Sequence, residues 1–194
     1  MKQKDRQNRG NKVLKEKKIR RFIVIGLITA VSVGIGLAVA SSKVLSGSKA
    51  ALSLDGIQCN AAEQLVFHNH AHIDIFINGQ PYRIPSQIGI VPGKCIYWLH
   101  THDDSGVIHI ESPVTRNFTL GQFFDIWNKK FSNMGIFDNT VNAKNAMLVY
   151  VNGSKMNPDG SYRSINLNEH DEIAIVYGKP PTNIPSKYDF QQGL

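Results

Sequence analysis

Six of the seven histidines lie in two short segments, 68–72 and 100–109. In the first segment the histidines alternate with other residues. Because the side-chain period of a β-strand is two, they share one face of an extended strand. In the second segment a histidine pair precedes the predicted turn 103–106, and a third histidine follows it. Histidine is the commonest metal ligand in proteins, so we predict a metal site. The candidate ligands are His68, His70, His72, His100, His102 and His109.

Three carboxylates are further candidate ligands. Asp74 continues the alternation on the first strand, Glu111 follows the histidine of the next strand by two residues, and Asp104 lies in the turn. Two strands about 4.8 Å apart can present ligands to one ion at about 2.0–2.1 Å. Imidazoles with an occasional carboxylate suit Zn²⁺, Cu²⁺, Ni²⁺ or Fe²⁺, and copper has the highest intrinsic affinity of these ions. The alternatives are a pH-responsive surface and histidines that serve no common purpose.

The elements that must position these residues are mostly strands. Alternation of apolar and polar residues predicts strands at 72–84, 95–102, 107–111, 146–153 and 172–178. Apolar residues at helical spacing, after Thr119 as N-cap, predict a helix over 119–131. Strands, one helix and further strands are typical of an α+β fold. We predict a mainly antiparallel sheet with one helix packed across it, β-grasp-like, preceded by one transmembrane helix.

The transmembrane helix is predicted at residues 22–40, which carry no charge and span roughly 28 Å as a helix. The preceding segment 1–21 holds ten Lys and Arg, which places the N-terminus in the cytoplasm and the C-terminal domain outside it. The alternative is a signal peptide cleaved after Ala40. The rest of the chain is close to neutral, which argues against a nucleic-acid-binding domain.

The chain therefore divides into five predicted parts. They are a basic cytoplasmic tail at 1–21, the membrane anchor at 22–40, a stalk at 41–56, an extracytoplasmic His-rich domain at 57–178 and an extended Pro-containing tail at 179–194. Small residues recur every four positions along the anchor, at Gly26, Ala30, Gly34 and Ala38. Such a stripe lets a partner transmembrane helix approach closely, although Gly and Ala are also simply common in membrane helices.

The two cysteines, Cys59 and Cys95, both belong to the predicted exported domain. Oxidising conditions outside the cytoplasm favour a disulfide between them. Such a bridge would close a loop of about 36 residues and stabilise the domain by about 3–4 kcal/mol. The alternative is that one or both are metal ligands.

The segments HNHAHIDIFING, IGIVPGKCIYWLHTHDDSGVIHIESP and TLGQFFDIW resemble a family of membrane-anchored, exported His-rich proteins from bacteria and archaea. The resemblance covers residues 64–194. It implies a single exported domain that brings both histidine motifs together, and it implies no particular reaction. The six candidate histidines are the positions that match the family's motifs.

We therefore predict a membrane-anchored extracytoplasmic protein that binds copper or zinc, as a carrier or as an accessory subunit of a membrane complex. One alternative is a metalloenzyme in which histidines hold an ion with an open coordination position. Another is a structural surface domain without metal. The chain has no phosphate-binding loop and no GxSxG or HExxH motif, so the sequence predicts no catalytic residue.

Overall fold

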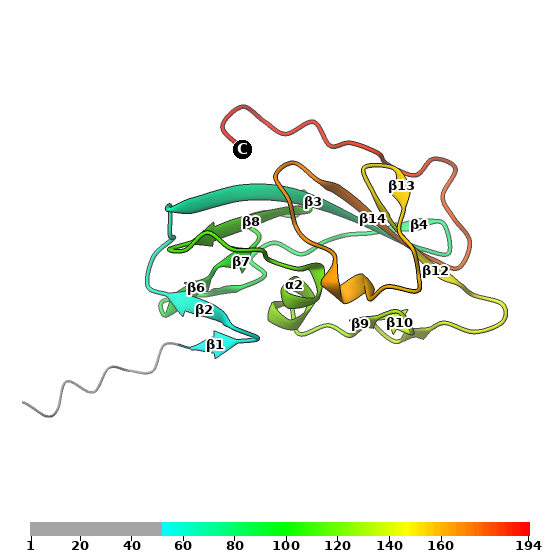
Figure 1. The fold of residues 1–194 in the computed structure, drawn as a ribbon, viewed down its shortest axis with the longest axis horizontal. Coiled ribbons are helices and arrows are strands. Elements are labelled where there is room, and N and C mark those ends of the chain that lie inside the picture. The colour runs from blue at the N-terminus through cyan, green and yellow to red at the C-terminus, as the bar shows by residue number, and fades with distance from the viewer. Residues whose placement is uncertain (1–51) are drawn as a thin grey trace, which may run out of the picture. The chain divides into compact units, whose positions relative to one another are not determined.

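The computed structural model describes residues 52–194 (Figure 1). Of these residues, 38% lie in strands and 7% in helices, and the strands form three sheets. The described part of the chain is therefore mostly β, with one short α-helix. The elements are β1 Ser53–Leu54, β2 Ile57–Asn60, β3 Phe67–Ile77, β4 Gln80–Tyr82, β5 Ile90–Val91, β6 Cys95–Tyr97, β7 Leu99–His100, β8 Val107–Ser112, α2 Leu120–Ile126, β9 Phe131–Ser132, β10 Gly135–Ile136, β11 Asn139–Thr140, β12 Met147–Val151, β13 Ser154–Lys155, the 3₁₀ turn η1 Tyr162–Ser164 and β14 Glu172–Tyr177.

The predicted α+β class, with its β-grasp-like sheet and crossing helix, is wrong. The helix begins as expected, because Thr119 and Gln122 form a reciprocal capping box. It ends after only seven residues, since Asn128 adopts a left-handed φ of 57° that no α-helix can continue. Phe131, expected in the last turn of the helix, instead begins β9 of the small sheet β11-β10-β9.

The other two sheets contain most of the strands. The segments 53–60 and 90–97 form a four-stranded sheet in the order β1-β2-β6-β5. Its first strand, Ser53–Leu54, falls in the segment predicted as a stalk. The main sheet has seven strands in the described part of the chain, in the order β13-β12-β14-β3-β8-β7, and β4 also pairs with β3.

The long strand β3 organises the main sheet. Its first half pairs antiparallel with β8, and its second half pairs with β4 through the tight turn Asn78–Gly79. Both turn residues have positive φ, 53° and 82°, as a type I′ turn requires. On its other side β3 runs parallel to β14, so the sheet is mixed rather than purely antiparallel. The sheet thereby holds β3, β8 and β7 side by side.

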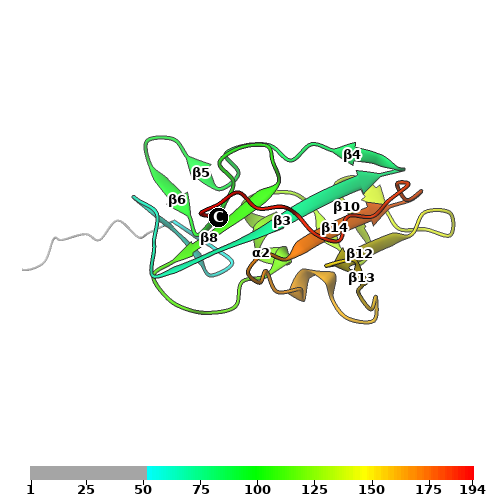
Figure 2. The ribbon, with the colours of Figure 1, turned by 90° about the horizontal axis from the view of Figure 1, so that it is seen from above.

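The two faces of this sheet differ sharply. On β3 and β8, Ala71, Ile73, Ile75, Ile108 and Ile110 are at most 1% exposed and pack into the core, as the alternation predicted. Helix α2 lies on this side of the sheet, and the C-terminal tail runs along the other side (Figures 1 and 2). The intervening residues of β3 and β8 therefore point away from α2, and they include the histidines.

The C-terminal tail, residues 179–194, forms neither helix nor strand, and Figure 2 shows it passing over the sheet. Tyr188 in this tail stacks on the ring of His72, with centroids 3.8 Å apart. Phe190 stacks on His170, whose Nε2 is 3.0 Å from the backbone oxygen of Leu194. The tail is thus attached to the histidine-bearing side of the domain.

Over residues 52–194, no helix is both long and apolar enough to cross a membrane. The predicted anchor at 22–40, the basic segment before it and the stripe of small residues lie outside the described residues.

The predicted disulfide is confirmed. Cys59 on β2 is bonded to Cys95 on β6, with their Cα atoms 5.3 Å apart, so neither cysteine is a metal ligand. The bridge joins β2 to β6 in the four-stranded sheet, and β7 begins two positions after the last residue of β6. It therefore constrains the segment that delivers the second histidine motif.

Removing this bridge should lower the free energy of unfolding by about 3–4 kcal/mol, because the reduced unfolded chain regains the entropy of a loop of 36 residues. Urea denaturation of the oxidised and the dithiothreitol-treated protein measures the difference. A Cys59→Ala/Cys95→Ala variant should match the reduced protein and no longer respond to dithiothreitol. A reductant effect that persists in this variant would contradict the assignment.

Candidate metal centre

Three histidines form a row across three neighbouring strands. His70 of β3 is paired in register with His109 of β8, which is paired in turn with His100 of β7. Residues directly opposite each other in antiparallel strands project to the same face, with Cβ atoms about 4.5–5.5 Å apart. The register therefore brings the two histidine motifs together, as the sequence predicted.

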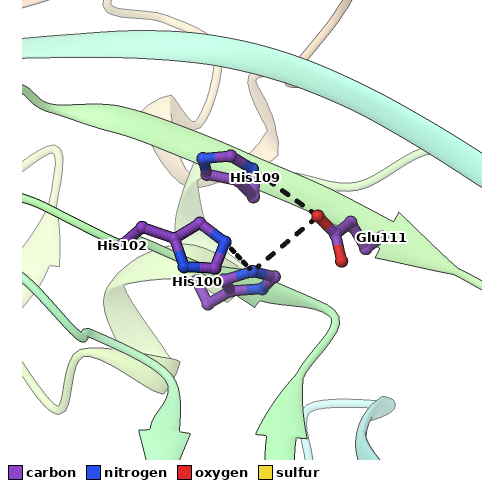
Figure 3. A group of neighbouring side chains, drawn as sticks. All are labelled: His100, His102, His109 and Glu111. Carbon is purple, nitrogen blue, oxygen red and sulfur yellow. Dashed lines mark hydrogen bonds and ion pairs between the residues drawn. The ribbon is translucent and has the colours of Figure 1, made fainter. Parts of the chain in front are cut away.

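The first group of candidate ligands comprises His100, His102, His109 and Glu111 (Figure 3). One donor atom from each lies within 4.8 Å of the others. His100 Nε2 is 3.2 Å from His102 Nε2 and 3.9 Å from Glu111 Oε1, which is 3.5 Å from His109 Nδ1. With bonds of 2.0–2.1 Å, two ligands of a tetrahedral ion lie roughly 3.3 Å apart. The separations of 3.2 and 3.5 Å are close to that value, and the separation of 3.9 Å is longer.

The orientation of His100 leaves one of its nitrogens available. Its Nδ1 is 3.0 Å from the carbonyl oxygen of Tyr97, an acceptor that requires Nδ1 to carry the proton. Nε2 then presents a lone pair to the group. A histidine that donates one ring N–H to a backbone carbonyl and offers the other nitrogen to a metal is the usual arrangement in metal sites.

A second group comprises His68, His70 and His109, so the two groups share His109. The His70 ring contacts both neighbours edge-on, at centroid distances of 4.7 Å to His68 and 4.6 Å to His109. Glu111 joins this group to the first one, because its Oε1 lies 3.4 Å from His68 Nε2. His68 also lies directly opposite Glu111 in the β3–β8 register.

Three buried polar atoms in these groups have no hydrogen-bond partner among the described residues: His70 Nε2, Glu111 Oε2 and His109 Nδ1, whose 3.5 Å contact with Glu111 Oε1 is not a hydrogen bond. Leaving a buried polar group unpaired costs about 1–3 kcal/mol, and more for a charged group. Such atoms are rare in native proteins, and three in one cluster require an explanation. A metal ion held by these atoms would provide one.

The electrostatics of the cluster keep its most buried imidazoles neutral. Burial, together with the neighbouring His109 and His68, lowers the pKa of His70 to about 4. Burial also lowers the pKa of His100 to about 4, although the Glu111 carboxylate opposes the shift. For Glu111, burial acts to raise the pKa, but the surrounding imidazoles outweigh it and the pKa is lowered. Neutral imidazoles beside an ionised carboxylate are the protonation states that bind metal.

Two of the candidate ligands are accessible to solvent. His100 is fully buried, whereas the side chains of His68 and His102 are 39% and 43% exposed. His102 also lines an open groove together with Arg83, Pro85, Ser86, Asp103 and Asp104. The candidate ligand Asp104 lies in this groove in an ion pair with Arg83 and belongs to none of the ligand groups.

His72 and Asp74 lie in a separate group with Glu172. Both ring nitrogens of His72 are engaged, since Nδ1 is 2.7 Å from Glu172 Oε2 and Nε2 is 2.8 Å from the carbonyl oxygen of Ser105. Asp74 Oδ2 is 4.0 Å from His72 Nδ1. This arrangement holds His72 as a buried hydrogen-bonded pair with Glu172 rather than as a ligand with a free lone pair.

The connection between β7 and β8 depends on its turn residues. Asp103 Oδ1 accepts a hydrogen bond of 2.9 Å from the Ser105 backbone N–H, as in an Asx turn. Gly106 has a φ of +93°, and a Cβ there would lie 2.6 Å from the backbone oxygen of Ile73. Only glycine fits this position, which allows the turn to pack against β3 beside His72.

Sequence reasoning missed two acidic residues that contact the histidines. Glu172 begins the predicted strand 172–178, but its pairing with His72 comes from the parallel register of β14 on β3, which the residue pattern does not reveal. Glu63 Oε1 lies 3.4 Å from His102 Nε2 at the exposed side of the first group. Glu63 belongs to no predicted element, so no periodicity could have placed it.

No family model, curated protein or solved structure matches the chain. The interpretation of the site therefore rests on its own chemistry.

Proposed function

We propose that the protein binds a divalent transition metal, copper or zinc, through His100, His102, His109 and Glu111. The observation that carries the proposal is the convergence of these donor atoms within 4.8 Å of one another, while His109 Nδ1 and Glu111 Oε2 are buried without a hydrogen-bond partner. Imidazole suits both metals, and the absence of a free thiolate in residues 52–194 disfavours ions that require sulfur. Copper should bind more tightly than zinc to the same ligands.

We further propose that residues 22–40 anchor this domain on the outside of the cytoplasmic membrane, with the basic segment 1–21 in the cytoplasm. The Cys59–Cys95 disulfide supports an oxidising compartment. In this setting the protein is a metal carrier or an accessory subunit of a membrane complex, and the stripe Gly26, Ala30, Gly34 and Ala38 is its contact with a partner helix. The resemblance to exported His-rich proteins agrees with this location.

A second candidate function, a metalloenzyme, is favoured by the open groove beside His102. A catalytic ion needs a coordination position open to solvent, whereas a binding site is saturated by protein ligands. Cobalt substitution distinguishes them, because an open cobalt site changes its visible spectrum when azide is added. An unchanged spectrum favours the carrier or accessory role.

The test of metal binding is metal analysis of the full-length chain, purified without a His tag and dialysed after exposure to Cu²⁺ or Zn²⁺. We expect tightly held metal, and its loss from this group in a His100→Ala/His102→Ala variant. His170→Ala is the matched control, since His170 is exposed and lies outside every ligand group. Equal metal content in the double variant and the wild type would contradict the proposed site.

A further inference from the structure

We propose that the histidine cluster is a dinuclear centre, in which the first group holds one ion, His68 and His70 hold a second, and His109 and Glu111 lie between them. This inference rests on the proposed function and extends it from one ion to two. Its first support is the number of ligands. A tetrahedral ion uses four ligands, and the first group already supplies four. His68 and His70 then remain, with donor atoms within 4.8 Å of His109.

The unpaired nitrogen of His70 indicates that this residue does not serve to orient a ligand of the first ion. A residue that orients a metal ligand normally does so through a hydrogen bond to that ligand. His70 is only 3% exposed, and its Nε2 has no such bond to any described residue. A second ion bound at His70 Nε2 would explain why this imidazole is buried although it donates no hydrogen bond to a neighbouring residue.

Glu111 occupies the position that a shared carboxylate needs. Its Oε1 lies 3.4 Å from His68 Nε2 of the second group and 3.9 Å from His100 Nε2 of the first, while Oε2 is buried and unpartnered. A carboxylate has two oxygens, so it can contact two ions at once. Two-metal sites in proteins commonly hold their ions about 3.5–4 Å apart. Glu111 is the only carboxylate of the two groups, and in this position it would neutralise charge on both ions.

Other histidines near the cluster do not compete for the second ion. Both nitrogens of His72 are engaged by Glu172 and Ser105. His170 contacts Glu169, Phe190 and the backbone oxygen of Leu194, and it belongs to no ligand group. The second ion therefore depends on His68 and His70 specifically.

The experiment is a Cu²⁺ titration of the full-length chain, followed by total copper analysis and by electron paramagnetic resonance spin counting. We expect two coppers per chain. Because two Cu²⁺ ions that share a ligand couple magnetically, fewer spins than coppers should be counted. A His68→Ala/His70→Ala variant should hold one copper with its full spin intensity, and His170→Ala should behave as the wild type.

The outcomes separate the dinuclear centre from the proposed function. One copper per chain in the wild type, unchanged in His68→Ala/His70→Ala, would overturn the dinuclear centre and leave the single site intact. Two coppers with full spin intensity would overturn the sharing of ligands. No bound copper would overturn both proposals. If His68→Ala/His70→Ala fails to fold, His70→Gln, which keeps a polar side chain of similar size, replaces it, and the wild-type spin count alone still tests the coupling.

Discussion

Saturating Zn²⁺ should raise the thermal unfolding midpoint of the wild-type protein by about 10 °C, and His109→Ala should abolish this shift. A ligand that binds only the folded state at 1,000 times its Kd stabilises by about 4 kcal/mol. For a domain of this size each kcal/mol corresponds to about 2–4 °C. His109 is decisive because it belongs to both ligand groups and is the middle of the row His70, His109 and His100.

The measurement is a thermal unfolding curve followed by circular dichroism, with and without metal. Comparing the metal-free curves of wild type and His109→Ala first shows whether the substitution itself harms the fold. His170→Ala should keep the full metal-dependent shift, since that histidine lies outside the groups. An equal shift in His109→Ala and wild type would show that zinc stabilises the protein from another site.

Each of the two histidine motifs could be predicted from sequence because each depends on short-range regularities. Alternation placed His68 and His70 on the face opposite Ile73, and the turn at 103–106 brought His100 back beside His109. These features follow from the period of a strand and from local turn chemistry. The pairing of β3 with β8, which brings the two motifs together, is a long-range contact that these regularities do not specify.

The features that sequence reasoning missed depend on long-range pairing or on a single backbone conformation. His72 continues the two-residue spacing of His68 and His70, yet it does not belong to the cluster. The reason is that β14 runs parallel to β3 and places Glu172 beside His72. The helix expected to reach residue 131 stops early because Asn128 adopts a left-handed conformation. Apolar spacing continues past that residue, so periodicity alone overestimates the helix and suggests the wrong fold class.

Replacing Glu172 with Ala should lower the free energy of unfolding by about 3–5 kcal/mol. The side chains of His72 and Glu172 are 4% and 1% exposed, and removing one partner leaves the other buried without its 2.7 Å contact. Urea denaturation of the metal-free protein measures the loss. The matched control is Asp138→Ala, which breaks an exposed pair with Lys130 and should cost less than about 1 kcal/mol.

A double variant separates the loss of the pair from the loss of packing. His72→Leu/Glu172→Met removes both polar groups while keeping much of the volume, and such replacements of buried ion pairs are often neutral or stabilising. It should therefore recover most of the stability lost in Glu172→Ala. A double variant as unstable as the single one would show that volume and shape, rather than an unpaired buried group, determine the loss.

The stability advantage of the wild type over Glu172→Gln should be larger at pH 5 than at pH 9. Burial acts to lower the pKa of His72, but Glu172, the Ser105 carbonyl and Asp74 outweigh it and the pKa is raised. Burial raises the pKa of Glu172 against the opposing effect of His72. Because the pKa values of His72 and Glu172 are both raised, the folded protein holds more protons than the unfolded chain. The pair's contribution to stability is therefore complete below the ordinary pKa values of the two groups, and it is lost as pH rises through their raised pKa values.

The difference in stability between the wild type and Glu172→Gln reports on the His72–Glu172 pair and not on the other histidines. His70 and His100 have lowered pKa values, so their contribution has the opposite sign and falls as pH drops from 6.5 towards about 4. Both proteins contain these residues, and their effect largely cancels in the comparison. Urea denaturation of the two metal-free proteins from pH 5 to pH 9 therefore follows the pair. A difference that grows with pH would mean that the pair holds fewer protons in the folded state, which its buried contact argues against.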